Sequence, residues 1–155
     1  MSVVKDSYEI FFDIVERITG QKKKKKRQLS ENLSDIASLL DDVRQKFKDN
    51  EIPRREAKEL TGLIFNANKL AIPFKEKYPA LAEVFDIRLN RIGSEMQIAD
   101  YSIEEELRED HLSKDKKNLV LSFTAQNQIN EACKEMERAA GILSSYSKIF
   151  KQEGE

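Results

Sequence analysis

Residues 28–47, QLSENLSDIASLLDDVRQKF, have the most regular apolar pattern in the chain. Its apolar residues recur at alternating steps of four and three, at Leu29, Leu33, Ile36, Leu40, Val43 and Phe47. This spacing places them on one face of an α-helix and is typical of a coiled-coil-like seam. The sequence therefore predicts a helix over residues 28–48 that packs lengthwise on a neighbouring helix.

Apolar stripes of the same kind predict helices along the rest of the chain. Gly20 is expected to end the first helix, Pro53 and Pro79 to open the third and fourth, and Ser102 with Glu105 to form a capping box at the start of a short acidic helix. The predicted helices cover residues 3–19, 28–48, 53–71, 79–99, 103–111 and 116–151. We predict an all-α fold in which residues 1–155 form one domain, a single antiparallel bundle of four main helices plus short extra helices.

The composition restricts the class of protein. Five Gly and three Pro are too few for the turns of an all-β sandwich or barrel, and the single cysteine, Cys133, cannot form an intramolecular disulfide. The longest stretch without a charged residue, 118–130, is shorter than the roughly 20 apolar residues that span a bilayer. No signal peptide is expected at the N-terminus. These features favour a cytoplasmic protein, with peripheral attachment to a membrane as an alternative.

Side chains for catalysis or metal binding are sparse. The sequence has one histidine, His111, preceded three residues earlier by Arg108, so it lacks the Glu-x-x-His pairs of di-iron bundles and the motif of bundle ribonucleases. It also lacks a phosphate-binding glycine loop. The acidic residues 104–106, 109 and 110 do not have the spacing of a calcium loop and are interpreted as a solvated face. We therefore predict no catalytic residue, no metal site, no cofactor and no enzymatic activity.

The distribution of charge gives the one candidate binding site. The chain has 27 Lys and Arg against 28 Asp and Glu, but six of its basic residues are consecutive. These six, the basic segment, are Lys22, Lys23, Lys24, Lys25, Lys26 and Arg27. The rest of the chain then holds 21 basic against 28 acidic residues, which makes it an acidic body.

The basic segment has two interpretations: a solvated turn between the first and second helices, or a docking site for an anionic partner. Nucleic acid is the partner it favours least, because the segment has no aromatic residue and the body around it is acidic. At an anionic membrane each Lys or Arg contributes about 1 kcal/mol. Beside it, Tyr8, Phe11 and Phe12 lie on an amphipathic helix, as in reversible membrane association, although a bundle would bury the same residues.

A first helix, a Lys-rich junction, a strict heptad helix and a third helix that ends near Pro73 together resemble the HeLo-like four-helix-bundle domains. These domains occur in mixed-lineage-kinase-like pseudokinases, plant immune receptors and fungal cell-death proteins, and the resemblance covers roughly residues 1–100. It implies a self-associating module that engages acidic phospholipids through basic residues, here Lys22 to Arg27. The acidic residues 104–110 and the long final helix depart from that family's pattern.

The sequence is therefore compatible with three functions. The first is a non-catalytic interaction module that docks electrostatically through the basic segment and contacts a protein partner or a second copy of itself. The second is a HeLo-like peripheral membrane effector that binds acidic phospholipids. The third is a small-molecule sensor with a ligand in the bundle core, which requires a pocket of about 300 Å³ or more.

Overall fold

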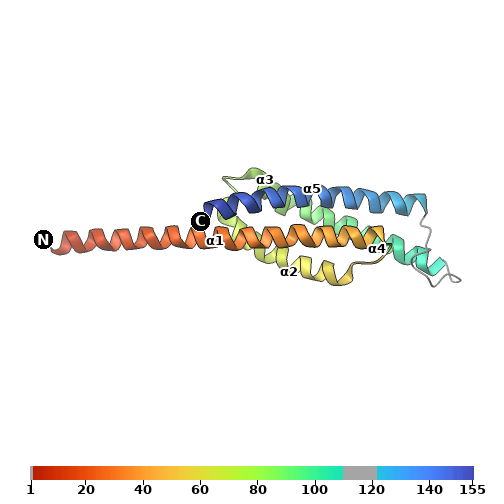
Figure 1. Ribbon diagram of the computed structural model, residues 1–155, viewed down its shortest axis with the longest axis horizontal. Coiled ribbons are helices and arrows are strands. Elements are labelled where there is room, and N and C mark those ends of the chain that lie inside the picture. Colours follow the sequence, from red (N-terminus) through yellow and green to blue (C-terminus); the bar gives the residue numbers. More distant parts are fainter. Residues whose placement is uncertain (1, 110–121) are drawn as a thin grey trace.

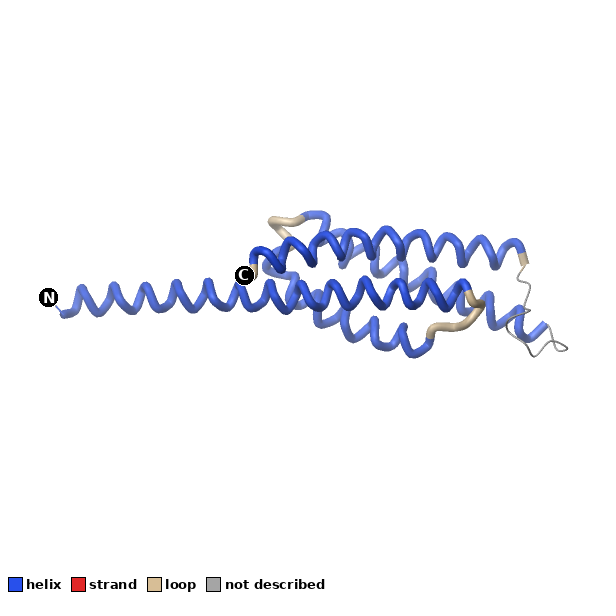
Figure 2. The backbone as a smooth tube through the Cα atoms, in the orientation of Figure 1, coloured by secondary structure: helices blue, strands red, loops and turns tan. Residues whose placement is uncertain are grey.

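A computed structural model describes residues 2–109 and 122–155, and every regular element in these ranges is helical (Figure 1, Figure 2). The all-α prediction is therefore confirmed for this part of the chain. The main helices are α1 (Ser2–Lys48), α2 (Arg54–Ala71), α4 (Leu89–Glu109) and α5 (Phe123–Glu153). Shorter elements join α2 to α4, namely the 3-10 turn η1 (Ile72–Phe74), α3 (Pro79–Glu83) and the π-helical turn η2 (Val84–Arg88).

The heptad face of α1 forms the centre of the core. Leu29, Leu33, Ile36, Leu40 and Val43 are fully buried, and Phe47 is 1% exposed. Burial of each such side chain contributes about 1.5 to 3 kcal/mol relative to exposure. The second half of α1 packs against α5 and α2, both of which run back along it, and α4 packs against α5 (Figure 1).

The first predicted turn is wrong, because α1 is one helix from Ser2 to Lys48. Gly20 neither ends a helix nor has a positive φ angle, and the predicted helices 3–19 and 28–48 are continuous through the basic segment. A glycine inside a helix costs only about 1 kcal/mol relative to alanine, which does not stop a helix that is favourable on both sides. The N-terminal part of α1 projects beyond the other described helices (Figure 2).

Helix α1 ends instead at a Schellman motif centred on Asn50. The Asn50 amide donates to the Phe47 carbonyl at 3.1 Å, and the Glu51 amide donates to the Lys46 carbonyl at 2.8 Å. Asn50 has a φ of 59°, a left-handed conformation that asparagine tolerates better than most residues. This geometry turns the chain back so that α2 lies against α1.

The helix boundaries after Pro79 also differ from the predicted ones. The segment predicted as one helix over 79–99 consists of α3, η2 and the first half of α4. The predicted capping box does not form, because Ser102 lies inside α4 and its hydroxyl donates to the Ile98 carbonyl at 2.9 Å. The predicted helix 103–111 is therefore the end of α4 as far as Glu109, and residues 110 and 111 lie outside the described residues.

The last helix begins with a hydroxyl cap. The Ala125 amide donates to the Ser122 hydroxyl at 3.2 Å, which satisfies one of the free amides of the first turn of α5. The predicted start of this helix, at residue 116, lies outside the described residues. Its inward face carries a long apolar stripe that includes Ile129, Met136, Leu143 and Phe150, all buried.

The position of Gly20 gives a direct test of the continuous helix. Substitution Gly20→Ala is expected to strengthen α1 locally by roughly 0.5 to 1 kcal/mol, because alanine has the higher helix propensity and a Cβ at this position meets no atom within 4 Å. Far-ultraviolet circular dichroism and slower amide hydrogen exchange around residues 20–24 report the change. Gly141→Ala, inside α5, is the matched control and is expected to give a similar gain. Lower helicity in Gly20→Ala alone would show that Gly20 ends a helix.

Candidate functional site

The basic segment lies inside α1, where the helix emerges from the packed part of the molecule. Lys22 to Lys25 are exposed, and Lys26 is half-buried. Successive residues of an α-helix are rotated by about 100° about the helix axis, so the six cations encircle the helix instead of sharing one face. They form five like-charged pairs three or four residues apart, which together weaken the helix by about 1 to 2.5 kcal/mol. Contacts from elsewhere in the chain therefore have to support this part of α1.

That support comes from the C-terminal end of α5. Lys26 Nζ lies 3.4 Å from Glu153 Oε2, and Arg27 Nη1 donates a hydrogen bond to the Gly154 carbonyl at 3.0 Å. Two cations thus meet the end of a helix where free carbonyl groups carry partial negative charge. We call Lys26, Arg27, Tyr78, Glu153 and Gly154 the α1–α5 clasp.

Gly154 is required in the clasp because of space. A Cβ at this residue would lie 2.7 Å from Arg27 Cγ and 3.2 Å from the Lys23 carbonyl oxygen. Its φ of −85° is available to any residue, so the glycine provides close approach and not an unusual conformation. A larger residue here would push the end of α5 away from α1.

Glu153 connects the basic segment to the loop before α3. The Tyr78 hydroxyl donates to Glu153 Oε1 at 2.6 Å, and Lys77 Nζ lies 3.7 Å from the same oxygen. The Tyr78 hydrogen bond lowers the pKa of the Glu153 carboxyl, with further contributions from the Lys26 and Lys77 charges, while partial burial opposes the shift. The carboxylate is therefore held in its charged form, and it compensates the charge of Lys26.

An aromatic cluster lies beneath the clasp. The ring of Tyr78 meets the rings of Tyr146 and Phe150 edge-on, at centroid distances of 5.6 Å and 5.4 Å, and Phe74 lies 5.3 Å from Phe150. Lys26 Nζ lies 5.7 Å from the centre of the Phe74 ring, within reach of a cation–π interaction. The end of α5 is therefore anchored by packing as well as by charge.

The basic segment is thus divided into two parts. Lys26 and Arg27 have partners in the clasp, whereas no ion pair among the described side chains, which leave out those of residues 2–16, 18 and 109, involves Lys22, Lys23, Lys24 or Lys25. The basic segment is visible in the sequence but the clasp is not, because Arg27 and Gly154 are 127 residues apart in the chain. The only sequence signal for the clasp was the pair of carboxylates Glu153 and Glu155, which follow the predicted end of the last helix at residue 151.

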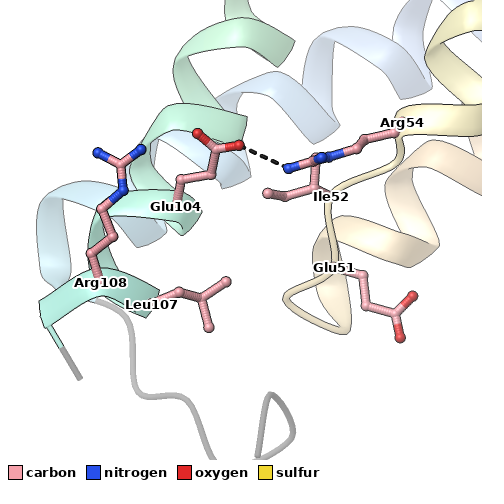
Figure 3. Close-up of a pocket in the computed structure, with 6 residues that line it drawn as sticks. All are labelled: Glu51, Ile52, Arg54, Glu104, Leu107 and Arg108. Carbon is pink, nitrogen blue, oxygen red and sulfur yellow. Dashed lines mark hydrogen bonds and ion pairs between the residues drawn. The ribbon is translucent and has the colours of Figure 1, made fainter. Parts of the chain in front are cut away.

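A second surface feature, at the opposite end of the packed helices, contains part of the acidic sequence. A pocket of about 640 Å³ lies between the turn after α1 and the end of α4, lined by Glu51, Ile52, Arg54, Glu104, Leu107 and Arg108 (Figure 3). Across it Arg54 Nη2 lies 3.0 Å from Glu104 Oε1. Because the Arg54 side chain is 77% exposed, this ion pair contributes at most about 1 kcal/mol. The pocket contains an ion pair, and its lining residues do not provide the acid, base and nucleophile that catalysis would need.

The acidic residues of α4 have separate partners. Glu105 Oε1 lies 3.2 Å from Arg108 Nη1, and Glu106 accepts a hydrogen bond from the Ser122 amide at 3.1 Å. Among the side chains that the structure describes, which leave out those of residues 2–16, 18 and 109, no group of three or more potential metal-ligating side chains converges. Asp110 and His111 lie outside the described residues. Cys133 is half-buried on α5, and burial raises the pKa of its thiol, which disfavours the thiolate.

The lowered pKa of Glu153 predicts a pH-dependent contribution to stability. Its stabilisation is complete above the unfolded-state value of about 4.5 and is lost as the pH falls through the lower folded-state pKa. Glu153→Gln is therefore expected to lower the free energy of unfolding by about 1 kcal/mol at neutral pH and by much less near pH 3. Urea unfolding at both pH values measures this. Glu155→Gln is the control, and an equal loss from Glu153→Gln at both pH values would exclude an electrostatic role.

The search for membrane spans and the comparisons with known proteins bear on what the site does. Over the described residues, no helix is both long enough and apolar enough to cross a bilayer. Comparison of the chain with protein-family models, curated proteins and solved structures finds no match. A function therefore has to be argued from the charges and surfaces of the chain itself.

Proposed function

We propose that the chain is a non-catalytic interaction module, a single antiparallel bundle of four main helices that docks electrostatically on an anionic partner. The docking site is the basic segment, and within it Lys22, Lys23, Lys24 and Lys25 make the contact. The observation that carries this proposal is the division of the basic segment by the clasp. Two of its cations are compensated by α5, and the other four are exposed on a projecting helix.

The surroundings of these four lysines favour an electrostatic mode of binding. They encircle a helix, so an anionic surface can approach from several directions without a precise register. The rest of the chain has an excess of acidic residues, which repels the same partner and directs it to the projecting end of α1. The interaction should therefore depend strongly on ionic strength.

The non-catalytic part of the proposal is supported by the state of the reactive side chains. The chain has one histidine and one cysteine, so a cysteine–histidine pair would have to use both. A nucleophilic cysteine needs a lowered pKa, whereas burial raises that of Cys133. Binding is thus better supported than catalysis.

An acidic protein surface is the partner that we favour, and a membrane of acidic phospholipids is the alternative. The alternative matches the resemblance to HeLo-like domains and draws on the same four lysines. It additionally requires the apolar residues of the N-terminal half of α1 to enter the lipid interface. The two partners can be separated by one binding experiment.

In that experiment, binding is measured to immobilised polyglutamate, to neutral vesicles and to vesicles containing acidic phospholipid, each at low and high salt. Replacement of Lys22, Lys23, Lys24 and Lys25 by Gln is expected to weaken binding to polyglutamate at least tenfold, since each charge near an anionic surface contributes about 1 kcal/mol. Glutamine keeps the helix propensity close to that of lysine, so α1 should remain folded.

The matched control replaces four exposed lysines of the body by Gln, at Lys48, Lys58, Lys134 and Lys148. It makes the same change in net charge and is expected to leave binding nearly unchanged. Equal weakening by both quadruple variants would show that net charge, and not the basic segment, controls docking. Strong binding to acidic vesicles without binding to polyglutamate would favour the membrane alternative.

A further inference from the structure

A groove separates α2 from α4, although both border the same core. Helix α1 packs on α2 and on α5, and α4 packs on α5, but α2 and α4 are not closely packed on each other. The groove between them has a volume of about 650 Å³. Its apolar lining includes the buried side chains of Leu60, Phe85, Leu89 and Met96, and Phe65, on α2, is 60% exposed.

The groove also contains hydrogen-bond acceptors without donors. Asn68 Oδ1 and Asp100 Oδ1 are buried, and neither accepts a hydrogen bond within the described residues. Burial, with a smaller effect of Glu104, raises the pKa of Asp100 to about 6. The other carboxylate of the groove is paired, with Asp86 Oδ1 2.9 Å from Lys75 Nζ, and Lys69 Nζ lies 4.2 Å from the centre of the Phe65 ring. The Arg54 charge partly opposes the rise in the pKa of Asp100, which forms no ion pair among the described side chains. An occupant that is apolar along one face and cationic at one end would complement these features.

The chain itself contains a helix of this description. Apolar residues at positions 4, 8, 11, 15 and 18 follow steps of four and three, which places these positions on one face of α1. The next position at this spacing is Lys22, which is exposed. This part of α1 projects beyond the other described helices, so it is spatially available to another molecule (Figure 1).

The groove matches part of the stripe in length. It is lined by α2 from Ala57 to Asn68 and by α4 from Leu89 to Asp100, 12 residues on each helix or about 18 Å, and the stripe from position 11 to Lys22 also spans 12 residues. Pairing the projecting helices of two copies with each other in parallel would instead place the Lys22–Lys25 clusters side by side, which like-charge repulsion disfavours. In the groove Lys22 would instead meet the carboxylate of Asp100.

We propose that the projecting part of α1 in one copy binds in the α2–α4 groove of a second copy. Positions 11, 15 and 18 lie along Phe65, above the buried floor formed by Leu89 and Met96, and Lys22 lies at the Asp100 end of the groove. Because the helix of one copy meets the groove of the next, the contact is heterologous and can extend into chains of molecules. The proposal goes beyond docking on an anionic partner, since it uses a different surface and shares only Lys22 with that site.

Analytical ultracentrifugation over a wide range of protein concentration tests the proposal. Gly93→Trp fills the groove, because Gly93 lines it and a Cβ there meets no atom within 4 Å. Gly141→Trp, on α5 and equally unobstructed, is the matched control. Wild type and Gly141→Trp are expected to form progressively larger species as concentration rises, and Gly93→Trp to associate at least tenfold more weakly. Phe65→Glu provides a second groove variant.

A mixing experiment identifies the two surfaces. The double variant Phe11→Asp and Val15→Asp interrupts the apolar stripe and leaves the groove intact, so alone it should remain monomeric. Mixed with Gly93→Trp, which keeps the helix and lacks the groove, it should form a dimer with one copy of each, because one complementary contact remains. Circular dichroism confirms that each variant is folded.

Three outcomes would overturn the proposal: a wild-type protein that is monomeric at all concentrations, a Gly93→Trp variant that assembles like wild type, or folded variants that fail to dimerise on mixing. The second outcome would indicate that the projecting helices pair with each other. Lys23→Glu with Lys24→Glu and Lys25→Glu separates this proposal from the docking function. It should abolish binding to polyglutamate and retain assembly, because Lys22 and the stripe are unchanged.

Discussion

The packing of the heptad face of α1 on α5 sets where the other helices lie and where α1 begins to project. Six apolar residues between Leu29 and Phe47 are almost completely buried, which fixes how far α5 extends along α1. Because α5 ends at Glu153, its last turn meets α1 at Lys26 and Arg27. The boundary between supported and projecting helix therefore falls inside the basic segment, and this boundary exposes four of its lysines.

The parts of the fold that were predictable are those set by periodicity within one helix. The heptad from Leu29 to Phe47 and the long stripe of α5 were identified from spacing alone, because burial of one face imposes that spacing. Residues whose local preferences indicate the start or end of a helix were less reliable guides. Gly20 and the Ser102 capping box both suggested ends of helices that do not exist, since their local preferences of about 1 kcal/mol are smaller than the gain from continuing a favourable helix.

The candidate site was predictable in its charges and not in its contacts. Six consecutive cations are visible in any reading of the sequence, but the separation of Lys26 and Arg27 from their neighbours depends on Glu153 and Gly154. These contacts join opposite ends of the chain, so no local pattern contains them. The same holds for the α2–α4 groove, where the placement of two helices leaves Asn68 Oδ1 and Asp100 Oδ1 without a hydrogen-bond donor from the part of the chain that the structure describes. Charge and spacing identify candidates, and tertiary packing decides which of them are available.

The exposure of four lysines of the basic segment depends on α1 running without interruption from the packed helices through that segment. Electron paramagnetic resonance measures this continuity as the distance between spin labels at Ser7→Cys and Asp42→Cys, with Cys133→Ala. In a continuous helix these positions are 35 residues apart, so a single distribution of label-to-label distances centred at about 52 Å is predicted. A turn at Gly20 would fold the first helix back onto the second and bring the labels within about 20 Å, the interaxial spacing plus the label tethers. That shorter distance would contradict the account.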